Sequence, residues 1–275
     1  MRGRTLSLSF PPFTYWVKRI VIACFVIFFA QVVLRAVAPG LYPYRLYGSL
    51  IPDLVVHYGM VWQLVSYSLL HEGVWHVLLN MLMLWMFGAQ LEQDWGPKKF
   101  LEFYVFCVIG AALTTIAVAY LRFPGLSPST PTVGASGGIF GILIAFGMLY
   151  GDQEVFMFPL PFMMKAKYMV AIMIFLVLIA TFQPTQGGVA NFAHLGGLLF
   201  GFLYIKFLPR RGLVYAASEK YYSLRNDYYR SKRRKAARKF EVYMREHGQN
   251  PGRFDEFGNY IPPDDKKGGN GKWVN

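Results

Sequence analysis

Polar side chains inside otherwise apolar stretches are the first feature of this sequence that suggests chemistry. Ser136, His76, His194 and Asn80 occur in or at the edges of long hydrophobic runs, and His71 lies close by. A polar group surrounded by hydrocarbon costs free energy, so such a residue is by default a functional hypothesis. Serine with histidine can perform nucleophilic catalysis, because serine is a poor nucleophile until a base removes its proton.

Ser136 lies in the sequence Thr132-Val-Gly-Ala-Ser-Gly-Gly138, which follows a proline-rich segment and opens a predicted helix. The first amides of a helix have no intrahelical acceptor, and the helix dipole makes them attract negative charge. A serine here can therefore be both a nucleophile and part of an oxyanion site. The motif alone also fits plain helix packing, because small residues are common where membrane helices meet.

His194 is the candidate base, because it lies near the outer start of its apolar run, as Ser136 does. The two side chains are therefore expected at a similar depth. Small residues four apart follow each of them and allow two helix backbones to approach closely. The sequence thus predicts contact between the helices that carry the serine and the base, through these glycines: Gly137 with Gly141, and Gly197 with Gly201.

His76 and Asn80 are four residues apart, so they share one helix face and can point into one site. His71 is five residues before His76, about 140° away around a helix of 3.6 residues per turn. His71 is therefore predicted to point elsewhere, under the first outer loop.

The elements that must position these residues are predicted to be membrane helices. Hydrophobic residues make up 55% of the 275 residues and charged ones only 16%, against roughly 25% charged in a soluble domain. A bilayer needs about 20 mostly apolar residues per helix. We predict an all-α membrane protein with six spans, at about residues 20–37, 63–90, 100–121, 134–150, 168–182 and 191–208.

Basic residues alternate from one connection to the next. They gather in the N-terminal segment, in the loops after spans two and four, and in the C-terminal tail. Lys and Arg mark the cytoplasmic side, so both termini are predicted to be cytoplasmic. The predicted organisation is a cytoplasmic segment 1–19, a six-helix domain 20–208 and a basic tail 209–275. The absence of an Arg- and Ser-rich transit peptide favours a bacterial plasma membrane.

Three motifs, in order along the chain, together resemble the rhomboid family of intramembrane serine proteases. The pattern covers about residues 62–201, with the six-span core around it. The resemblance implies a rhomboid-like bundle that cuts membrane-anchored proteins at or near the bilayer surface, without a cofactor. The motifs are His71-x4-His76-x3-Asn80, Gly134-x-Ser136-Gly137 and Ala193-His194-x2-Gly197-x3-Gly201.

The same resemblance implies roles for the residues. Ser136 would attack the scissile carbonyl, and His194 would take its proton and later protonate the leaving amine. His76, Asn80 and the backbone amide of Ser136 would hold the oxyanion. Span five and the loop after it would gate the access of substrate. Residues with a structural role near the site would be His71, Gly134, Gly137, Gly197 and Gly201.

One departure from the family pattern concerns the first outer loop. Some members carry Trp-Arg where this chain has Trp62-Gln63. We therefore expect this loop to be held differently here.

Other functions fit the sequence less well. The main alternative is a catalytically silent relative that binds or escorts membrane clients, although Ser136 and His194 are both present. Three histidines suggest zinc, but the nearest acid adjoins His71, predicted to face away from His76, so no metal is predicted. A transporter would be favoured by an inverted repeat, and no clear one is seen. The net charge of +13 fits cytoplasmic Lys and Arg better than nucleic-acid binding.

The tail is predicted to be helical from about residue 212 to 247, with a basic patch at Ser231-Lys-Arg-Arg-Lys235. The favoured interpretation is a solvated cytoplasmic tail, and binding to anionic lipids is the open alternative. From Gly248 onward Gly, Pro, Asp and Asn predominate, which predicts disorder.

Overall fold

The computed structural model describes residues 11–121, 127–156, 163–182, 188–207 and 213–248, together with 253–254 and 260–261. By its internal contacts the chain divides into two units, Met1–Gly212 and Leu213–Asn275. The second unit contains the predicted tail helix, α10 (Leu213–Glu246), and two short antiparallel strands, β3 (Arg253–Phe254) and β4 (Tyr260–Ile261). The remaining residues of the segment predicted to be disordered, from 249 onward, lie outside the described residues.

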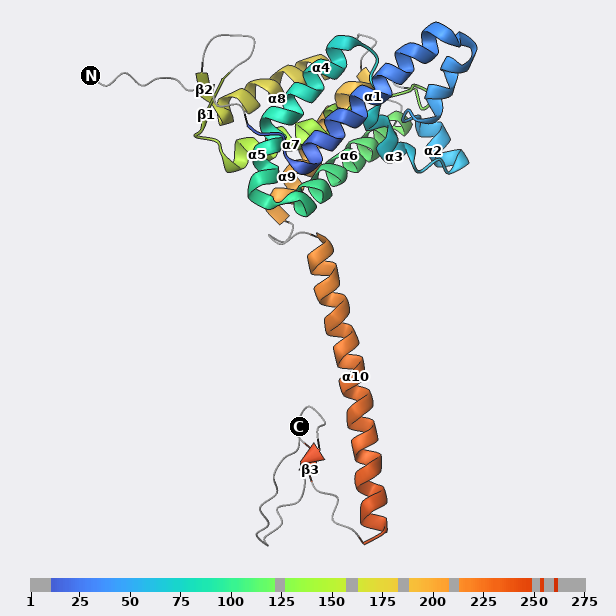
Figure 1. Cartoon of the computed structure of the whole chain (residues 1–275), viewed down its shortest axis with the longest axis vertical. Coiled ribbons are helices and arrows are strands. Elements are labelled where there is room, and N and C mark those ends of the chain that lie inside the picture. Colours follow the sequence, from blue (N-terminus) through green and yellow to red (C-terminus); the bar gives the residue numbers. More distant parts are fainter. Residues whose placement is uncertain are drawn as a thin grey trace, which may run out of the picture. The chain divides into compact units, whose positions relative to one another are not determined.

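The first unit is built from long helices (Figure 1). Short elements connect the first long helix to the second: η1 (Pro39–Tyr47), α2 (Pro52–Tyr58), α3 (Gln63–Ser66) and η2 (Tyr67–Leu69). Strands β1 (Glu154–Phe156) and β2 (Met163–Lys165) pair antiparallel before α8. The long elements are α1 (Tyr15–Val37), α4 (Val74–Met83) continued by η3 (Leu84–Gly88) and α5 (Ala89–Trp95), α6 (Pro97–Tyr120), α7 (Ser136–Leu149), α8 (Ala166–Phe182) and α9 (Gly188–Phe207).

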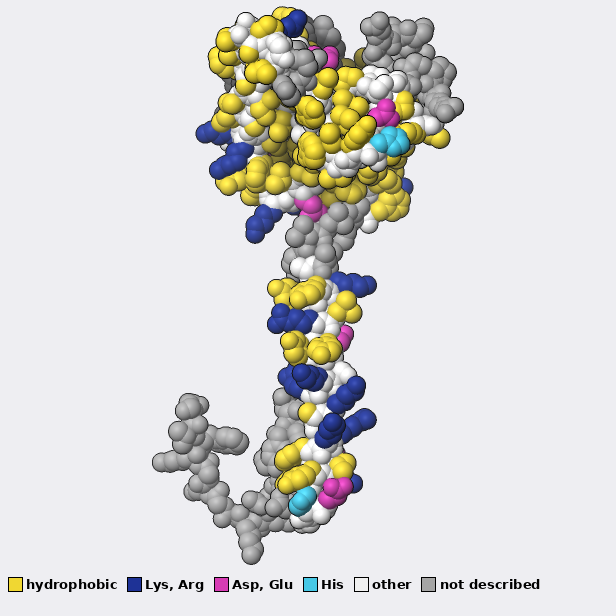
Figure 2. Space-filling model, turned by 90° about the vertical axis from the view of Figure 1, so that its right-hand side faces the viewer, with side chains coloured by type: hydrophobic (Ala, Val, Ile, Leu, Met, Phe, Trp, Pro, Cys, Tyr) yellow, Lys and Arg dark blue, Asp and Glu magenta, His cyan; other side chains and the backbone are white. Residues whose placement is uncertain are grey.

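Several helices of the first unit are apolar enough for a membrane. Among the described residues, three are also long enough to cross one: Tyr15–Val37, Val74–Trp95 and Pro97–Tyr120. Ser136–Leu149 and Ala166–Ile179 are shorter apolar helices. Hydrophobic side chains cover much of the visible face of this unit (Figure 2). The mostly helical, apolar build predicted from composition is therefore observed.

The predicted start of the second span is wrong. A single span over residues 63–90 was expected, but α3 and η2 end at Leu69 and the long helix begins only at Val74. Leu70 and Gly73 between them are extended, with ψ of 144° and 166°. The polar residues at the predicted start of this span belong to the separate turn formed by α3 and η2. The side chains of Gln63 and Ser66 donate hydrogen bonds to backbone carbonyls of the preceding segment, residues 46–48.

Helices α6, α7 and α9 contact one another pairwise and form the centre of the unit. Small residues make this possible, since α6 buries Gly110, Ala111 and Ala112. A Cβ atom added to Gly110 would lie 2.1 Å from the Phe200 ring of α9. Close packing against α6 therefore helps to fix the position of α9.

Polar contacts join the C-terminal ends of α5 and α7 to the β1–β2 hairpin. Tyr150 donates a hydrogen bond to Asp94, and the amides of Gln90 and Gln153 bond each other. Lys167 and Lys165 approach Asp152 at 2.7 and 3.3 Å. Hydrogen bonds from these two lysines lower the pKa of the Asp152 carboxyl. The exposed hairpin is thus held by charge as well as by strand pairing.

Glu92 is a buried carboxylate that joins α5 to the start of α1. Its oxygens accept hydrogen bonds from the Thr14 hydroxyl and from the backbone amides of Trp16 (2.7 Å) and Val17 (3.0 Å). Amides in the first turn of a helix have no intrahelical acceptor. Glu92 supplies that acceptor from another helix, and its negative charge suits the positive end of the α1 dipole.

We expect Glu92→Ala to destabilise the protein by about 2–4 kcal/mol, because it strands buried donors that the carboxylate satisfies. The measurement is the unfolding midpoint in detergent micelles. Gln93→Ala is the matched control, since Gln93 is the exposed neighbour on the same helix. Equal midpoints for the two variants would mean that the hydrogen bonds of Glu92 to the start of α1 contribute nothing to stability.

Candidate active site

Ser136 and His194 lie together. Ser136 is the first residue of α7, and its Oγ lies 2.8 Å from Nε2 of His194 on α9. For the hydroxyl to donate to Nε2, the proton of the neutral imidazole must be on Nδ1. In this arrangement the ring can accept the serine proton directly.

The imidazole of His194 is held by stacking on Phe140. The two ring centroids are 4.5 Å apart and the planes differ by 30°. Phe140 is four residues after Ser136, so it lies on the same face of α7. Among the described residues, the buried Nδ1 of His194 has no hydrogen-bond partner. Sequence analysis missed Phe140, and its spacing from Ser136 was the available signal.

The glycine faces of α7 and α9 meet, as the sequence predicted. A Cβ atom on Gly197 would lie 1.9 Å from the carbonyl oxygen of Gly137. A Cβ on Gly201 would lie 2.8 Å from the Cα of Gly141. Any side chain larger than hydrogen at Gly197 would therefore force the two backbones apart.

His76 lies beside the backbone that leads into Ser136. A Cβ on Gly134 would lie 2.7 Å from His76 Nε2 and 3.7 Å from Ser136 Oγ. The φ of Gly134 is also +124°, a conformation that L side chains rarely adopt. Glycine is therefore required here both by backbone conformation and by the close imidazole.

Asn80 is on α4 together with His76, as the four-residue spacing predicted. Its side chain is buried, and Nδ2 donates a 2.7 Å hydrogen bond to the carbonyl oxygen of His76. An amide nitrogen carries two N–H groups. The second N–H group of Asn80 can donate to another acceptor bound near His76.

The predicted direction of His71 is wrong. The rings of His71 and His76 touch edge to face, with centroids 5.0 Å apart. His71 precedes α4, so helical spacing does not relate it to His76. Its backbone amide donates to Gln31 of α1 at 3.5 Å, a buried polar residue that sequence analysis missed. Within the described residues, no three His, Cys, Asp or Glu side chains form a metal-binding group.

The segment before Ser136 is fixed to neighbouring segments by backbone hydrogen bonds. Leu50 and Thr132 form an antiparallel bridge with two bonds of 2.9 Å. The amide of Gly134 donates to the carbonyl of Tyr67, also at 2.9 Å. The chain therefore reaches Ser136 along a path set by residues far away in the sequence.

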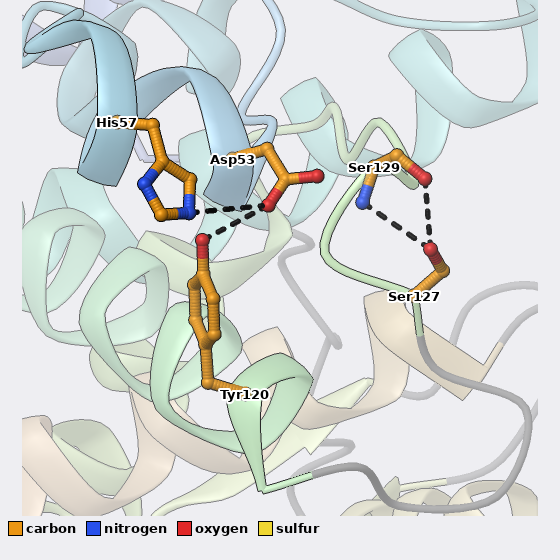
Figure 3. Close-up of polar contacts among 5 residues, drawn as sticks. All are labelled: Asp53, His57, Tyr120, Ser127 and Ser129. Atoms are coloured by element: carbon orange, nitrogen blue, oxygen red, sulfur yellow. Dashed lines mark hydrogen bonds and ion pairs between the residues drawn. The ribbon is translucent and has the colours of Figure 1, made fainter.

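Helix α2 is joined to the same region by side chains (Figure 3). Asp53 accepts a 2.9 Å hydrogen bond from Tyr120 at the end of α6, and His57 lies 4.0 Å from the same carboxylate oxygen. The amide of Asp53 donates to the carbonyl of Pro128, next to the bonded pair Ser127 and Ser129. These contacts are exposed and brace the segment that leads to Ser136.

Gln63 holds the loop between η1 and α2. Its side chain is fully buried, and Nε2 donates to the carbonyls of Leu46 (3.4 Å) and Tyr47 (3.2 Å). Its Oε1 accepts from the amide of Ile51 at 3.0 Å. An amide can both donate and accept, whereas arginine can only donate. Gln63 therefore bonds both ends of this loop. An arginine at this position could bond the carbonyls but could not accept from the amide of Ile51.

Residues 58–211 match the Rhomboid domain family. The chain is 33% identical over 163 residues to RHOMBOID-like protein 1 of Arabidopsis thaliana, a match over 57% of this chain and 36% of that protein. It is 32% identical over 155 residues to Rhomboid protease AarA of Providencia stuartii, covering 52% of this chain and 54% of the relative. With Rhomboid protease GluP of Bacillus subtilis, identity is 29% over 147 residues, covering 52% and 25%. The matches thus span from about a quarter to about half of these relatives.

We expect Gly197→Ala to lower the free energy of unfolding by about 3 kcal/mol, at the upper end for overpacking, because the clash is with backbone. The measurement is thermal unfolding of the purified protein in detergent. Gly40→Ala is the control, since a Cβ there meets nothing within 4 Å. A Gly197 variant as stable as the Gly40 variant would contradict the close approach of α7 and α9.

Proposed function

Because this chain belongs to the rhomboid family, we propose that it is an intramembrane serine protease in which Ser136 is the nucleophile and His194 the general base. The observation that carries the proposal is the 2.8 Å contact between Ser136 Oγ and His194 Nε2 within an apolar helical unit. The proposed substrates are membrane-anchored proteins, cut in or near their membrane segments. The two relatives described as rhomboid proteases support this class of activity.

In the proposed reaction, Ser136 Oγ attacks the scissile carbonyl carbon while its proton passes to Nε2 of His194. The imidazolium then gives that proton to the leaving amine, and the C–N bond breaks. Water, deprotonated by the same imidazole, hydrolyses the acyl–enzyme ester and restores the Ser136 hydroxyl. His194 therefore acts as base and acid in turn, with no carboxylate partner in the scheme.

The oxyanion is proposed to form between α4 and the start of α7. Its donors are the Ser136 amide, Asn80 and His76. The proposal is supported by the position of His76 beside Gly134 and by the second N–H of Asn80. Donors already in place in a site with little water are worth several kcal/mol of the barrier each. His71 is proposed to support His76, because its ring packs against it.

We also propose the finer topology: six spans within residues 20–208, flanked by a cytoplasmic segment 1–19 and a cytoplasmic tail 209–275. The alternation of Lys and Arg supports it. Helix α8 would gate the access of substrate, and most of its described apolar side chains are exposed. The relatives described above come from a plant and from two bacteria, so the bacterial plasma membrane stays a prediction.

The first prediction from this proposal separates a protease from a silent relative. The purified protein, reconstituted with a single-span reporter substrate, should cleave it, and Ser136→Ala should not. Ser127→Ala is the matched control, since Ser127 lies in the loop of Figure 3 and is exposed. A fluorophosphonate should label wild type and the Ser127 variant alone. Cleavage by the Ser136 variant would contradict the proposal, and a wild type that neither cleaves nor labels would favour the client-binding alternative.

The second prediction concerns pH. Only a neutral imidazole accepts the serine proton, so kcat/KM should fall tenfold per pH unit once the pH is below the pKa of His194. The measurement is the rate of reporter cleavage across the acid range, with unfolding followed at each pH. A rate independent of pH down to the lowest pH at which the protein stays folded would argue against His194 as the base.

The third prediction concerns the oxyanion donors. Asn80→Ala should lower kcat by about 10²–10³-fold with little change in KM, because the donor acts mainly in the transition state. Fluorophosphonate labelling of Ser136 should survive, though more slowly. A change in KM alone would assign Asn80 to substrate binding instead.

A further inference from the structure

Helix α10 carries a face that is both aromatic and basic. At about 100° per residue, Tyr221, Arg225, Tyr228, Lys232 and Lys239 fall on one side of the helix. We call this side the tyrosine–lysine face. Contacts agree with the geometry, since the Arg225 guanidinium lies 5.8 and 5.9 Å from the rings of Tyr222 and Tyr229 at its border.

The acidic residues of α10 are placed on the other side. The helix has ten Lys or Arg residues and four Asp or Glu, a net charge of +6. Glu219, Asp227 and Glu241 all project about 160–240° away from Tyr221 around the axis. Only Glu246, the last residue, falls near the tyrosine–lysine face. For most of its length this face therefore has positive charge without negative charge.

The tyrosine–lysine face is exposed. Tyr221, Tyr222, Tyr228 and Tyr229 have exposed fractions between 48% and 64%. Leu224 adds a further exposed apolar side chain at the edge. Figure 2 shows hydrophobic and basic side chains interleaved along the helix. Exposed apolar side chains gathered on one face are typical of a surface that binds a membrane or another protein.

The chemistry of the face fits the surface of an anionic bilayer. Tyrosine prefers the boundary between lipid and water, and Lys or Arg beside it can extend their charges to phosphates. Nucleic acid would satisfy the cations but leave Leu224 in water. The connection from α9 is also short, because only residues 208–212 separate Phe207 from Leu213. Five residues span at most about 20 Å, so a lipid surface at the end of α9 would be within reach of α10.

We propose that α10 lies on the anionic lipid headgroups next to the membrane domain, with its tyrosine–lysine face toward the lipid. The inference rests on the membrane embedding of the first unit and not on its proteolytic activity. Tyrosine rings enter the headgroup layer, and Arg225, Lys232 and Lys239 bind lipid phosphates. The opposite side, which carries Glu219, Asp227 and Glu241, faces water.

The test uses the full-length chain in lipid nanodiscs. A nitroxide is attached at Ala236→Cys, on the tyrosine–lysine face, or at Ser223→Cys, on the opposite side. Cys24 and Cys107 are buried and do not compete for the label. Discs contain phosphatidylcholine alone or mixed with phosphatidylglycerol. Collision of the label with oxygen reports lipid, and collision with a water-soluble nickel chelate reports water.

In anionic discs the Ala236 label should gain oxygen collisions and lose nickel collisions, while the Ser223 label stays accessible to nickel. In neutral discs both labels should remain accessible to nickel. A nickel-accessible Ala236 label in anionic discs would overturn the proposal. Protection of both labels from the nickel chelate would also overturn it. So would equal protection of the Ala236 label in neutral and in anionic discs. Dipolar broadening between Ala236 labels would assign the face to a second copy of the chain.

Charge variants on the two sides make the test specific to a face. The triple variant R225Q/K232Q/K239Q removes three positive charges from the tyrosine–lysine face. The control R230Q/R234Q/R238Q removes three from elsewhere on the helix, and glutamine keeps both variants helical. At about 1 kcal/mol for each cation at an anionic surface, the first variant should weaken lipid contact roughly 100-fold. Equal weakening by both variants would mean non-specific attraction and would overturn the assignment of a face.

Discussion

The close approach of α7 and α9 is the constraint on which the rest of the site depends. The carbonyl of Gly137 occupies the place where a side chain of residue 197 would begin. At this separation Ser136, at the start of one helix, and His194, one turn before Gly197 on the other, come within 2.8 Å. Helix α6 supports the pair from a second side, because Gly196 packs against Ala111 and Thr114. The hydrogen bond between Ser136 and His194 thus depends on the close contact between the backbones of α7 and α9.

The second constraint is the cost of unpaired polar groups where water is scarce. The segments around the site are not helical at Leu70–Gly73 or at Thr132–Gly134, so their backbone groups need partners elsewhere. Leu50 pairs with Thr132, and the carbonyl of Tyr67 accepts from Gly134. Gln63 satisfies three backbone groups of the neighbouring loop with one amide. The irregular backbone that shapes the site is therefore tolerated because it is paired.

Sequence alone predicted the mostly helical, apolar class and the meeting glycine faces of α7 and α9, since each depends on composition or on spacing within one helix. It failed where local conformation departs from a helix. The break at Leu70–Gly73 moved His71 out of the helix and next to His76, which no periodicity could indicate. Phe140 and Gln31 were missed for another reason, because an aromatic and a buried amide within apolar runs resemble ordinary packing. The contacts that bring distant segments to Ser136 depend on the tertiary fold and leave no local signal.

The stacking of Phe140 on His194 bears on how the proposed base is oriented without a carboxylate partner. In a three-residue arrangement an acid bonds Nδ1, fixes the tautomer and orients the ring. Here, within the described residues, Nδ1 has no such partner, and the flat ring is held against another flat ring instead. Stacking fixes the plane of the imidazole without adding a charge that would have to be buried in lipid. Phe140, which orients the ring, also comes from α7, the helix that carries Ser136. Ser136 and His194 are consequently positioned by one helix pair, so a shift of α9 that lengthens their hydrogen bond also disturbs the stacking that orients the His194 ring.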